Sequence, residues 1–421
     1  MPGASGASAD SWSSSRTERE PRERWVYARR MNLMPLHMPR LGPLPVFIAL
    51  LCACAAPPAA KDFNTPLAPS SPALLRVLDK NEWPAVRSGW RDREELLPAL
   101  EASIRWTSRR QSEAFFPIEG IGHAQALASL ERFYKLLTES TSAEEFERTF
   151  KAEFAAYKSA GWDGRGGGVL FTGYYTPILD GRLASSPEFP EPLYALPEDL
   201  VKGSGGTILG RRTATGIENY PTRRTIEASG SLAGRGLELV WLASPLDAFI
   251  AHVNGSAFVR LENGELARFG YAGNNGHDYT SLARELVAAG ELAADESNLA
   301  AIRAWARRHP ERVTSFLERN DRFVFFTTIE GNPRGSLNLE VTAGHSLATD
   351  KTIFPRGALV FCDARGKGGD GPAQFMLDQD TGGAIRTAGR ADIYFGFGDT
   401  AEARAGALKA EGQLYYFFLD V

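Results

Sequence analysis

The chain is poor in the residues that build metal centres and disulfide frameworks. It has 3 cysteines and 6 histidines among 421 residues, and no two histidines lie at the spacing of metal ligands. Two of the cysteines lie close together near the N-terminus. The third, Cys362, lies in an apolar stretch that is typical of a buried small side chain. We therefore expect no metal, no cofactor and no disulfide network.

Long hydrophobic runs and a strong net charge are also missing. No stretch of 18 or more apolar residues occurs, which excludes an ordinary membrane-spanning helix. The formal net charge is -4, which is too small to indicate nucleic acid or another polyanion as a partner. The hydrophobic content of 43% is enough for a large core and roughly two or three domains.

Common catalytic and phosphate-binding motifs are absent as well. The chain has no Gly-x-Ser-x-Gly elbow. Its glycine-rich stretches GRGGG (164–168) and GSGG (203–206) lack the Lys-Ser/Thr that follows in a phosphate-binding loop. These absences argue against a serine hydrolase and against a nucleotide-binding site.

The first 54 residues are predicted to lie outside the globular part. Residues 1–30 are rich in Ser, Arg, Glu and Gly and show no apolar period, which is typical of disorder. A short apolar run follows Arg40 and ends in small residues, as in a secretory signal peptide. Met31 is a better start for such a signal than Met1, because residues 1–30 would bury its charged region.

The stretch LCAC at the end of this run resembles a bacterial lipoprotein box. It predicts acylation of Cys54, which would tether the mature chain to a membrane without a spanning helix. The expected location is then the periplasmic face of the outer membrane. The alternative is a soluble periplasmic protein that is cleaved near the same cysteines.

The remaining chain is arranged in blocks of helices and strands. Helical patterns occupy residues 94–114 and 123–160, and short strands follow from about 168 to 269. Helices return over 278–319, and the chain is β-rich again from 322. Because strands and helices do not alternate, a doubly wound parallel sheet is not expected. The sequence predicts a mainly β fold with α-helical segments.

Three aspartates, Asp378, Asp380 and Asp392, lie among glycines and β-forming residues in LDQDTGGAIRTAGRADIYFGFG (377–398). Neighbours in a strand face opposite sides, so Asp392 and Tyr394 share one face and can line a groove. A carboxyl on a rigid strand beside an aromatic ring is partly desolvated, which suits a general acid. The alternative is that all three aspartates cap turns or accept backbone hydrogen bonds.

The C-terminal part resembles a small bacterial domain that is named for three aspartates. In that pattern one aspartate precedes an IP-x-G turn, one precedes TGG-x-I, and one lies in R-x-D-[IL]-Y. The matching residues here are Asp350, Asp380 and Asp392. Asp378 lies outside the pattern.

Upstream motifs resemble the membrane-bound lytic murein transglycosylase A family. They occur in the family's order, and the resemblance covers roughly residues 90–421. The motifs that carry it are LFTGYYTP (170–177), PTRRTIE (221–227), WLASPLDAFIAHVNGSAFVRL (241–261) and GYAGNNGHDYTSL (270–282).

The resemblance implies a double-psi β-barrel domain, an inserted second β-barrel domain, and a substrate groove between the two. Residues 55–90 would then be a Pro- and Ala-rich linker. The other expected boundaries are 91–176 for the N-terminal helices and the start of the first barrel, 177–315 for the insert with its trailing helices, and 316–421 for the three-aspartate part that completes the first barrel.

The function that the resemblance implies is cleavage of the β-1,4 bond between N-acetylmuramic acid and N-acetylglucosamine in peptidoglycan, without water. The product is a 1,6-anhydro-muramyl end. One carboxyl suffices for this reaction, because the same group can act first as an acid and then as a base. Ordinary glycosidases generally need two carboxylates. By the family pattern the single catalytic acid is Asp392.

The resemblance also implies roles for other residues. Asp380 and Asp350 would orient Asp392 or the substrate. Aromatic, hydroxyl and amide side chains suit sugar rings and acetamido groups, and glycine permits a close approach of the backbone. The expected substrate-binding residues are Thr172, Tyr174, Tyr175, Asn275, Tyr394 and Gly383.

The expected partners are peptidoglycan glycan strands, the membrane through the lipid anchor, and complexes of wall synthesis, and we expect a monomer. Two other functions stay open at this point. One is a hydrolytic glycosidase of the muramidase or cellulase-like kind, and the other is a lipoprotein that binds peptidoglycan without cutting it.

Overall fold

The structure is a computed structural model and describes residues 61–203, 207–365 and 371–420. The predictions on the signal peptide and on Cys54 lie outside the described residues. Within the described ranges no helix has the length and apolar character that a membrane crossing requires.

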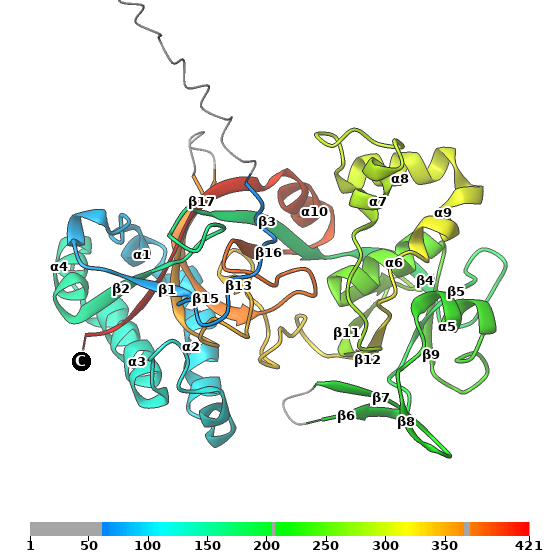
Figure 1. The fold of residues 1–421 in the computed structure, drawn as a ribbon, viewed down its shortest axis with the longest axis horizontal. Coiled ribbons are helices and arrows are strands. Elements are labelled where there is room, and N and C mark those ends of the chain that lie inside the picture. Colours follow the sequence, from blue (N-terminus) through cyan, green and yellow to red (C-terminus); the bar gives the residue numbers. More distant parts are fainter. Residues whose placement is uncertain (1–60, 204–206, 366–370, 421) are drawn as a thin grey trace, which may run out of the picture. The chain divides into compact units, whose positions relative to one another are not determined.

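Six strands form a closed barrel (Figure 1), in the order β17-β14-β15-β13-β16-β3. The ring closes because β17 also pairs with β3. Two pairs, β3 with β16 and β13 with β15, are parallel. The strands are β3 (Val169–Thr176), β13 (Ser346–Ala348), β14 (Leu359–Asp363), β15 (Ala373–Asp380), β16 (Arg390–Phe397) and β17 (Lys409–Leu419).

Two further strands, β1 (Leu74–Val77) and β2 (Phe154–Ser159), extend the sheet from β17. Sequence periodicity predicted helix up to residue 160, and this was wrong for β2. The segment pairs instead along β17, from Phe154 opposite Leu419 to Lys158 opposite Tyr415. Tertiary pairing overrides a local helical pattern here.

The long strand β17 separates two hydrophobic cores. Side chains alternate across a strand, and accordingly Tyr416 and Phe418 enter the barrel core while Tyr415 and Phe417 enter a second core. That second core lies under helices of the N-terminal part. These helices are α1 (Ser88–Arg91), α2 (Arg93–Thr107), α3 (His123–Glu139) and α4 (Ala143–Glu153), with short 3-10 turns η1 (Lys80–Glu82) and η2 (Arg110–Phe115).

A six-stranded sheet is inserted between β3 and β13, in the order β12-β11-β10-β4-β9-β5. Its two ends meet through a bridge between Ala195 and Phe326. The strands are β4 (Ile178–Arg182), β5 (Glu191–Tyr194), β9 (Glu238–Leu242), β10 (Ser256–Arg260), β11 (Leu266–Asn274) and β12 (Val324–Thr328). A small sheet of β6 (Leu200–Lys202), β7 (Ile208–Thr213) and β8 (Gly216–Glu218) accompanies it.

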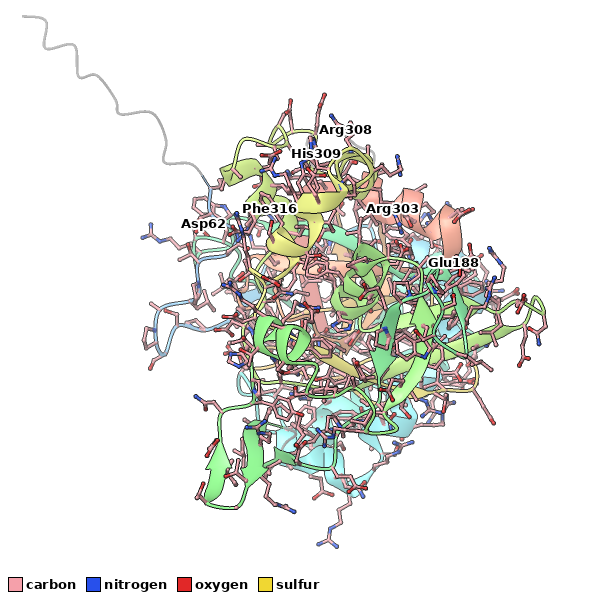
Figure 2. The ribbon with its side chains drawn as sticks, turned by 90° about the vertical axis from the view of Figure 1, so that its right-hand side faces the viewer. Asp62, Glu188, Arg303, Arg308, His309 and Phe316 are labelled. Carbon is pink, nitrogen blue, oxygen red and sulfur yellow. The ribbon has the colours of Figure 1, made fainter. Side chains whose placement is uncertain are left out.

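Helices α5 (Arg223–Ser229) and α6 (Pro245–Asn254) belong to the inserted part. Three more, α7 (Leu282–Ala288), α8 (Leu299–Arg308) and α9 (Pro310–Leu317), lead back to β12, and α10 (Gly398–Ala407) joins β16 to β17. Figure 2 labels His309 at the junction of α8 and α9, with Phe316 further along α9. The architecture confirms a mainly β fold with helical segments.

Candidate active site

A pocket of about 580 Å³ lies where the barrel meets the inserted part. The barrel contributes β3, β16 and the loop after β15. The inserted part contributes the end of α6, the loop before α7 and the segment before β12. Asp392, Asp380, Tyr174 and Gly383 all line this pocket.

Asp392 has one carboxylate oxygen held and the other available. It lies on β16 directly opposite Thr172 of the parallel strand β3. The Thr172 hydroxyl donates a short hydrogen bond to Oδ1 of Asp392, and Nη2 of Arg390 lies 3.4 Å from the same oxygen. Oδ2 has no hydrogen-bond partner among the described residues, and the side chain is 19% exposed. Asp392 can therefore present a carboxyl oxygen to a bound molecule.

Asp380 is held on both oxygens. The Tyr174 hydroxyl donates to Oδ2 at 2.8 Å, and the backbone amides of Ser336 and Thr381 donate to Oδ1, each at 2.8 Å. Burial raises the pKa of Asp380 above its ordinary value, while these hydrogen bonds oppose the rise. A carboxylate with three donors is suited to orient its neighbours.

Asp350 is placed differently from the other two members of the predicted triad. It does not line the pocket. Its carboxylate accepts hydrogen bonds from the backbone amide and the hydroxyl of Thr352, and its carbonyl accepts from Phe354. These bonds fix the turn that follows β13. The geometry of Asp350 is that of a turn-capping residue.

Asp378 is fully buried in the barrel and forms an ion pair with Lys351. The hydroxyls of Thr349 and Tyr416 also donate to its carboxylate, Tyr416 at 2.8 Å. Burial raises the pKa of Asp378 and lowers that of Lys351.

The structure brings only some of the predicted substrate-binding residues to the pocket. Tyr174 and Gly383 line it, and Thr172 lies behind Asp392. Tyr175 is 5% exposed and donates to Glu402 at 2.6 Å, next to a different, smaller pocket.

Tyr394 and Asn275 are buried, each 2% exposed. Tyr394 was expected to share the groove with Asp392. Instead the ring of Tyr174 packs against it, with ring centroids 5.2 Å apart. The amide group of Asn275 donates to the carbonyls of Pro221 and Asp321 and accepts from the amide of Phe323, so it joins three segments of the insert.

Sequence reasoning missed most of the pocket wall that the insert supplies. Asp278 and Tyr279 follow Asn275 by three and four residues, after a turn at Gly276 with φ of +82°. The polar run after that glycine was the available signal. The other polar lining residues were not singled out either. Some lie inside the quoted motifs, namely His252, Asn254, Ser281, Arg386 and Arg390, and others lie outside them, namely Asn64, Arg284, Asn320 and Arg322.

His252 is a neutral group in the pocket wall. Nη2 of Arg223 lies 2.8 Å from Nδ1 of His252, and because a guanidinium only donates, Nδ1 is the acceptor. Burial and the charge of Arg223 hold the pKa of His252 well below its usual range. In the parts of the chain that the structure describes, no group of His, Cys, Asp and Glu is arranged to hold a metal ion.

Two family models match the chain. The MltA specific insert domain matches residues 170–327, and the 3D domain matches residues 345–418. These two segments contain all the aspartates discussed above.

Relatives of known name and structure agree with the family models. Membrane-bound lytic murein transglycosylase A of Vibrio cholerae is 30% identical over 309 residues, covering 70% of this chain and 79% of the relative. The protein of the same name from Escherichia coli K12 is 34% identical over 258 residues, covering 59% and 65%.

Solved structures show the same fold. The membrane-bound lytic murein transglycosylase of Agrobacterium tumefaciens has a TM-score of 0.68 at 26% identity, covering 82% of this chain and 98% of that one. E. coli MltA with bound chitohexaose has a TM-score of 0.64 at 25% identity, covering 83% and 96%. This chain therefore belongs to the family of membrane-bound lytic murein transglycosylases A.

Proposed function

We propose that this protein is a lytic transglycosylase that cleaves peptidoglycan with Asp392 as its single catalytic acid and base. Its family membership supports the reaction class, and the solved E. coli relative carries a bound chitohexaose, a glycan chain. The observation that carries the assignment to Asp392 is that this residue lines the pocket while its Oδ2 has no hydrogen-bond partner among the described residues. Asp380, in contrast, has both oxygens engaged.

The proposed reaction balances without water. Protonated Asp392 donates its proton to the glycosidic oxygen between N-acetylmuramic acid and N-acetylglucosamine, and the bond from C1 to that oxygen breaks. The resulting carboxylate then takes the proton of the C6 hydroxyl as this oxygen closes on C1. The products are a 1,6-anhydro-muramyl end and a free N-acetylglucosamine end, and Asp392 is protonated again.

Thr172, Arg390 and Asp380 support this role in different ways. Thr172 and Arg390 fix Oδ1 of Asp392, which leaves Oδ2 to face the substrate. Asp380 holds the hydroxyl of Tyr174, whose ring forms part of the pocket wall. A pre-positioned carboxyl loses little rotational freedom at the moment of proton transfer.

A hydrolytic glycosidase is the second candidate, because Asp278 from the insert also lines the pocket. In that mechanism Asp278 would activate a water or attack C1 while Asp392 protonates the leaving group. The two mechanisms give different products. Transglycosylation gives anhydro ends that are lighter by one water than the reducing ends of hydrolysis.

Digestion of purified sacculi, followed by mass spectrometry of the soluble fragments, tests the proposal. We expect anhydro-muropeptides from the wild type and none from Asp392→Asn, with an unchanged thermal unfolding midpoint. Asp399→Asn is the matched control, because Asp399 is exposed on α10 and lies outside this pocket. Reducing-end products that disappear in Asp278→Asn would establish hydrolysis, and the absence of any soluble fragment would indicate a binding protein.

We further propose that acylated Cys54 holds the enzyme at the periplasmic face of the outer membrane. The names of the relatives support association with a membrane. Cys54→Ala should move the protein from the membrane fraction to the soluble periplasmic fraction. If the variant stays with the membranes, a different attachment operates.

A further inference from the structure

Four arginines and three aspartates line the pocket. Arg390 is occupied by Asp392 and Thr172, and Asp380 is held by Tyr174 and two backbone amides. The arginines that remain, Arg284, Arg322 and Arg386, form no ion pair within 4.0 Å in the described ranges 61–203, 207–365 and 371–420. Of the three aspartates in the lining, Asp278 alone has not been assigned a partner above, so one negative charge stands against these three positive charges. The lining therefore has more arginines than aspartates, and its net charge is positive.

Arg322 is held by three hydrogen bonds. Its backbone amide donates to Oδ1 of Asn320 at 3.3 Å, and its carbonyl accepts from the buried Arg223 at 2.9 Å. Its Nη1 donates to the carbonyl of His277 at 3.1 Å. A guanidinium has five N–H donors, and no other side-chain hydrogen bond of Arg322 is made within the described part of the chain. The remaining donors are available to a molecule in the pocket.

Gly383 lets the guanidinium of Arg322 lie against the barrel loop. A Cβ at Gly383 would lie 3.3 Å from Nε of Arg322, which is tighter than ordinary contact. Gly383 was expected to permit a close approach of the backbone, and the group that approaches it is an arginine of the insert. Arg386 lies three residues further along the same barrel loop and is exposed.

Arg322 and Arg386 both line the pocket, and their charges have the same sign. Burial is the main cause that lowers the pKa of Arg322, and the positive charge of Arg386 lowers it further. Tyr271 and Asp278 act in the opposite direction. Two like charges at one wall of a pocket cost free energy unless an anion lies between them.

We propose that Arg322 and Arg386 form a subsite that binds a carboxylate of the glycan substrate. This inference rests on the proposed function and adds the charged group that the site recognises. Arginine matches the planar geometry of a carboxylate and binds it with two parallel hydrogen bonds. Peptidoglycan offers such groups on the peptide stems, and on the lactyl ether of muramic acid where the stem has been removed. N-acetylglucosamine has no carboxylate, so the subsite distinguishes the two sugars. It thereby determines which glycosidic bond is positioned next to Asp392.

Binding measurements with charged and neutral glycans test the subsite. The Asp392→Asn background prevents turnover, and isothermal titration gives Kd with and without Arg322→Gln. The ligands are neutral chitohexaose, peptide-free strands with free lactyl carboxylates, and strands with intact stems. We expect Arg322→Gln to weaken binding of a carboxylate-bearing ligand about tenfold, as for a lost charge-assisted hydrogen bond. Chitohexaose binding should stay unchanged, and Arg386→Gln should repeat the pattern.

Arg308→Gln is the control for net charge, because Figure 2 shows Arg308 at the end of α8, and it lies outside the pocket lining. It should bind all three ligands as the parent does. Arg322→Lys keeps the charge without the planar fork and should retain part of the affinity.

The outcomes separate clearly. If Arg322→Gln loses affinity for peptide-free strands alone, the subsite binds the lactyl carboxylate. If it loses affinity for strands with intact stems alone, the subsite binds a carboxylate of the stem. Either result supports the subsite. Equal losses for chitohexaose and the charged ligands, or no loss for either, would overturn it. If the wild type shows the charge-selective binding but releases no anhydro products, the proposed function fails while the carboxylate subsite stands.

Discussion

At the scale of single residues, hydrogen-bond donors decide what each aspartate can do. The four acids Asp350, Asp378, Asp380 and Asp392 lie within 43 positions of one another, yet their surroundings differ completely. Asp350 caps a turn, Asp378 pairs with a buried lysine, and Asp380 accepts three hydrogen bonds. Asp392 keeps one oxygen without a partner among the described residues. All four are aspartates, so their hydrogen-bond partners and their burial separate their roles.

The buried pair of Lys351 and Asp378 makes a prediction about stability. Lys351→Met should cost about 3–5 kcal/mol of the free energy of unfolding, because it leaves an uncompensated carboxylate in the barrel. The double variant Lys351→Met/Asp378→Leu should recover most of that loss, since no buried charge remains. Urea denaturation of the two single variants and the double variant measures both effects. A double variant that is no more stable than Lys351→Met would contradict this account.

At the scale of elements, strand register and helix ends set the geometry. The parallel register of β3 and β16 puts Thr172 opposite Asp392 and Tyr174 opposite Tyr394. This register explains why the ring of Tyr174 covers Tyr394 while Asp392 remains accessible.

Among the helices, α4 is preceded by Ser142, whose hydroxyl accepts from the amide of Glu145, as expected for an N-cap.

The contact between α3 and the end of α4 gives a prediction about pH. Nε and Nη2 of Arg132 donate to the two oxygens of Glu153 at 2.6 and 2.8 Å. The hydrogen bond from Arg132 lowers the pKa of Glu153. Its folded pKa lies below its unfolded value of about 4.3. The stabilisation is therefore present above that pH and disappears as the pH falls through the folded pKa.

Glu153→Gln should lower the free energy of unfolding by about 0.5 kcal/mol at pH 7, a small effect because solvent screens a partly exposed pair. The difference from wild type should vanish as the pH falls through the folded pKa of Glu153. Chemical denaturation at several pH values measures it. Glu101→Gln, which alters the exposed pair with Arg105 at 3.8 Å, is the control and should change stability less. A difference that stays constant with pH would refute the assignment.

At the scale of the whole molecule, the barrel is completed by chain from both sides of the insert. Strand β3 precedes the insert, while β13 to β17 follow it, and β17 pairs with β2, β3 and β14. The pocket therefore exists only when strands from distant parts of the sequence have paired. This topology also explains why helices α1 to α4 share their hydrophobic core with the last strand of the chain.

Removal of β17 should abolish the fold. A chain that ends at Leu408 loses the strand that closes the barrel and exposes both hydrophobic cores, so we expect no cooperative thermal transition in near-ultraviolet circular dichroism. A chain that begins at Ala59 and keeps β17 is the control and should unfold cooperatively, because the compact unit starts there. A sharp transition in the shortened chain would show that the barrel does not need this strand.

The mainly β class and the family can be recognised from the sequence alone, and the family motifs contain Asp392, Asp380, Tyr174 and Gly383, which line the pocket. These predictions depend on the alternation of side chains along a strand and on motifs whose residues are contiguous in the chain. Such patterns can be recognised without knowledge of the tertiary structure. Local patterns failed at β2, where helical periodicity gave way to pairing with β17, because pairing partners lie far away in sequence.

Which groups remain available to a ligand depends on the three-dimensional fold. Asn275 belongs to a recognised motif, but its amide is used to join three segments of the insert. Arg322 belongs to none of the quoted motifs, yet its guanidinium faces the pocket beside the barrel loop. A hydrogen-bonding group can bind substrate only if the fold leaves it unsatisfied, and satisfaction depends on partners that are brought together in space.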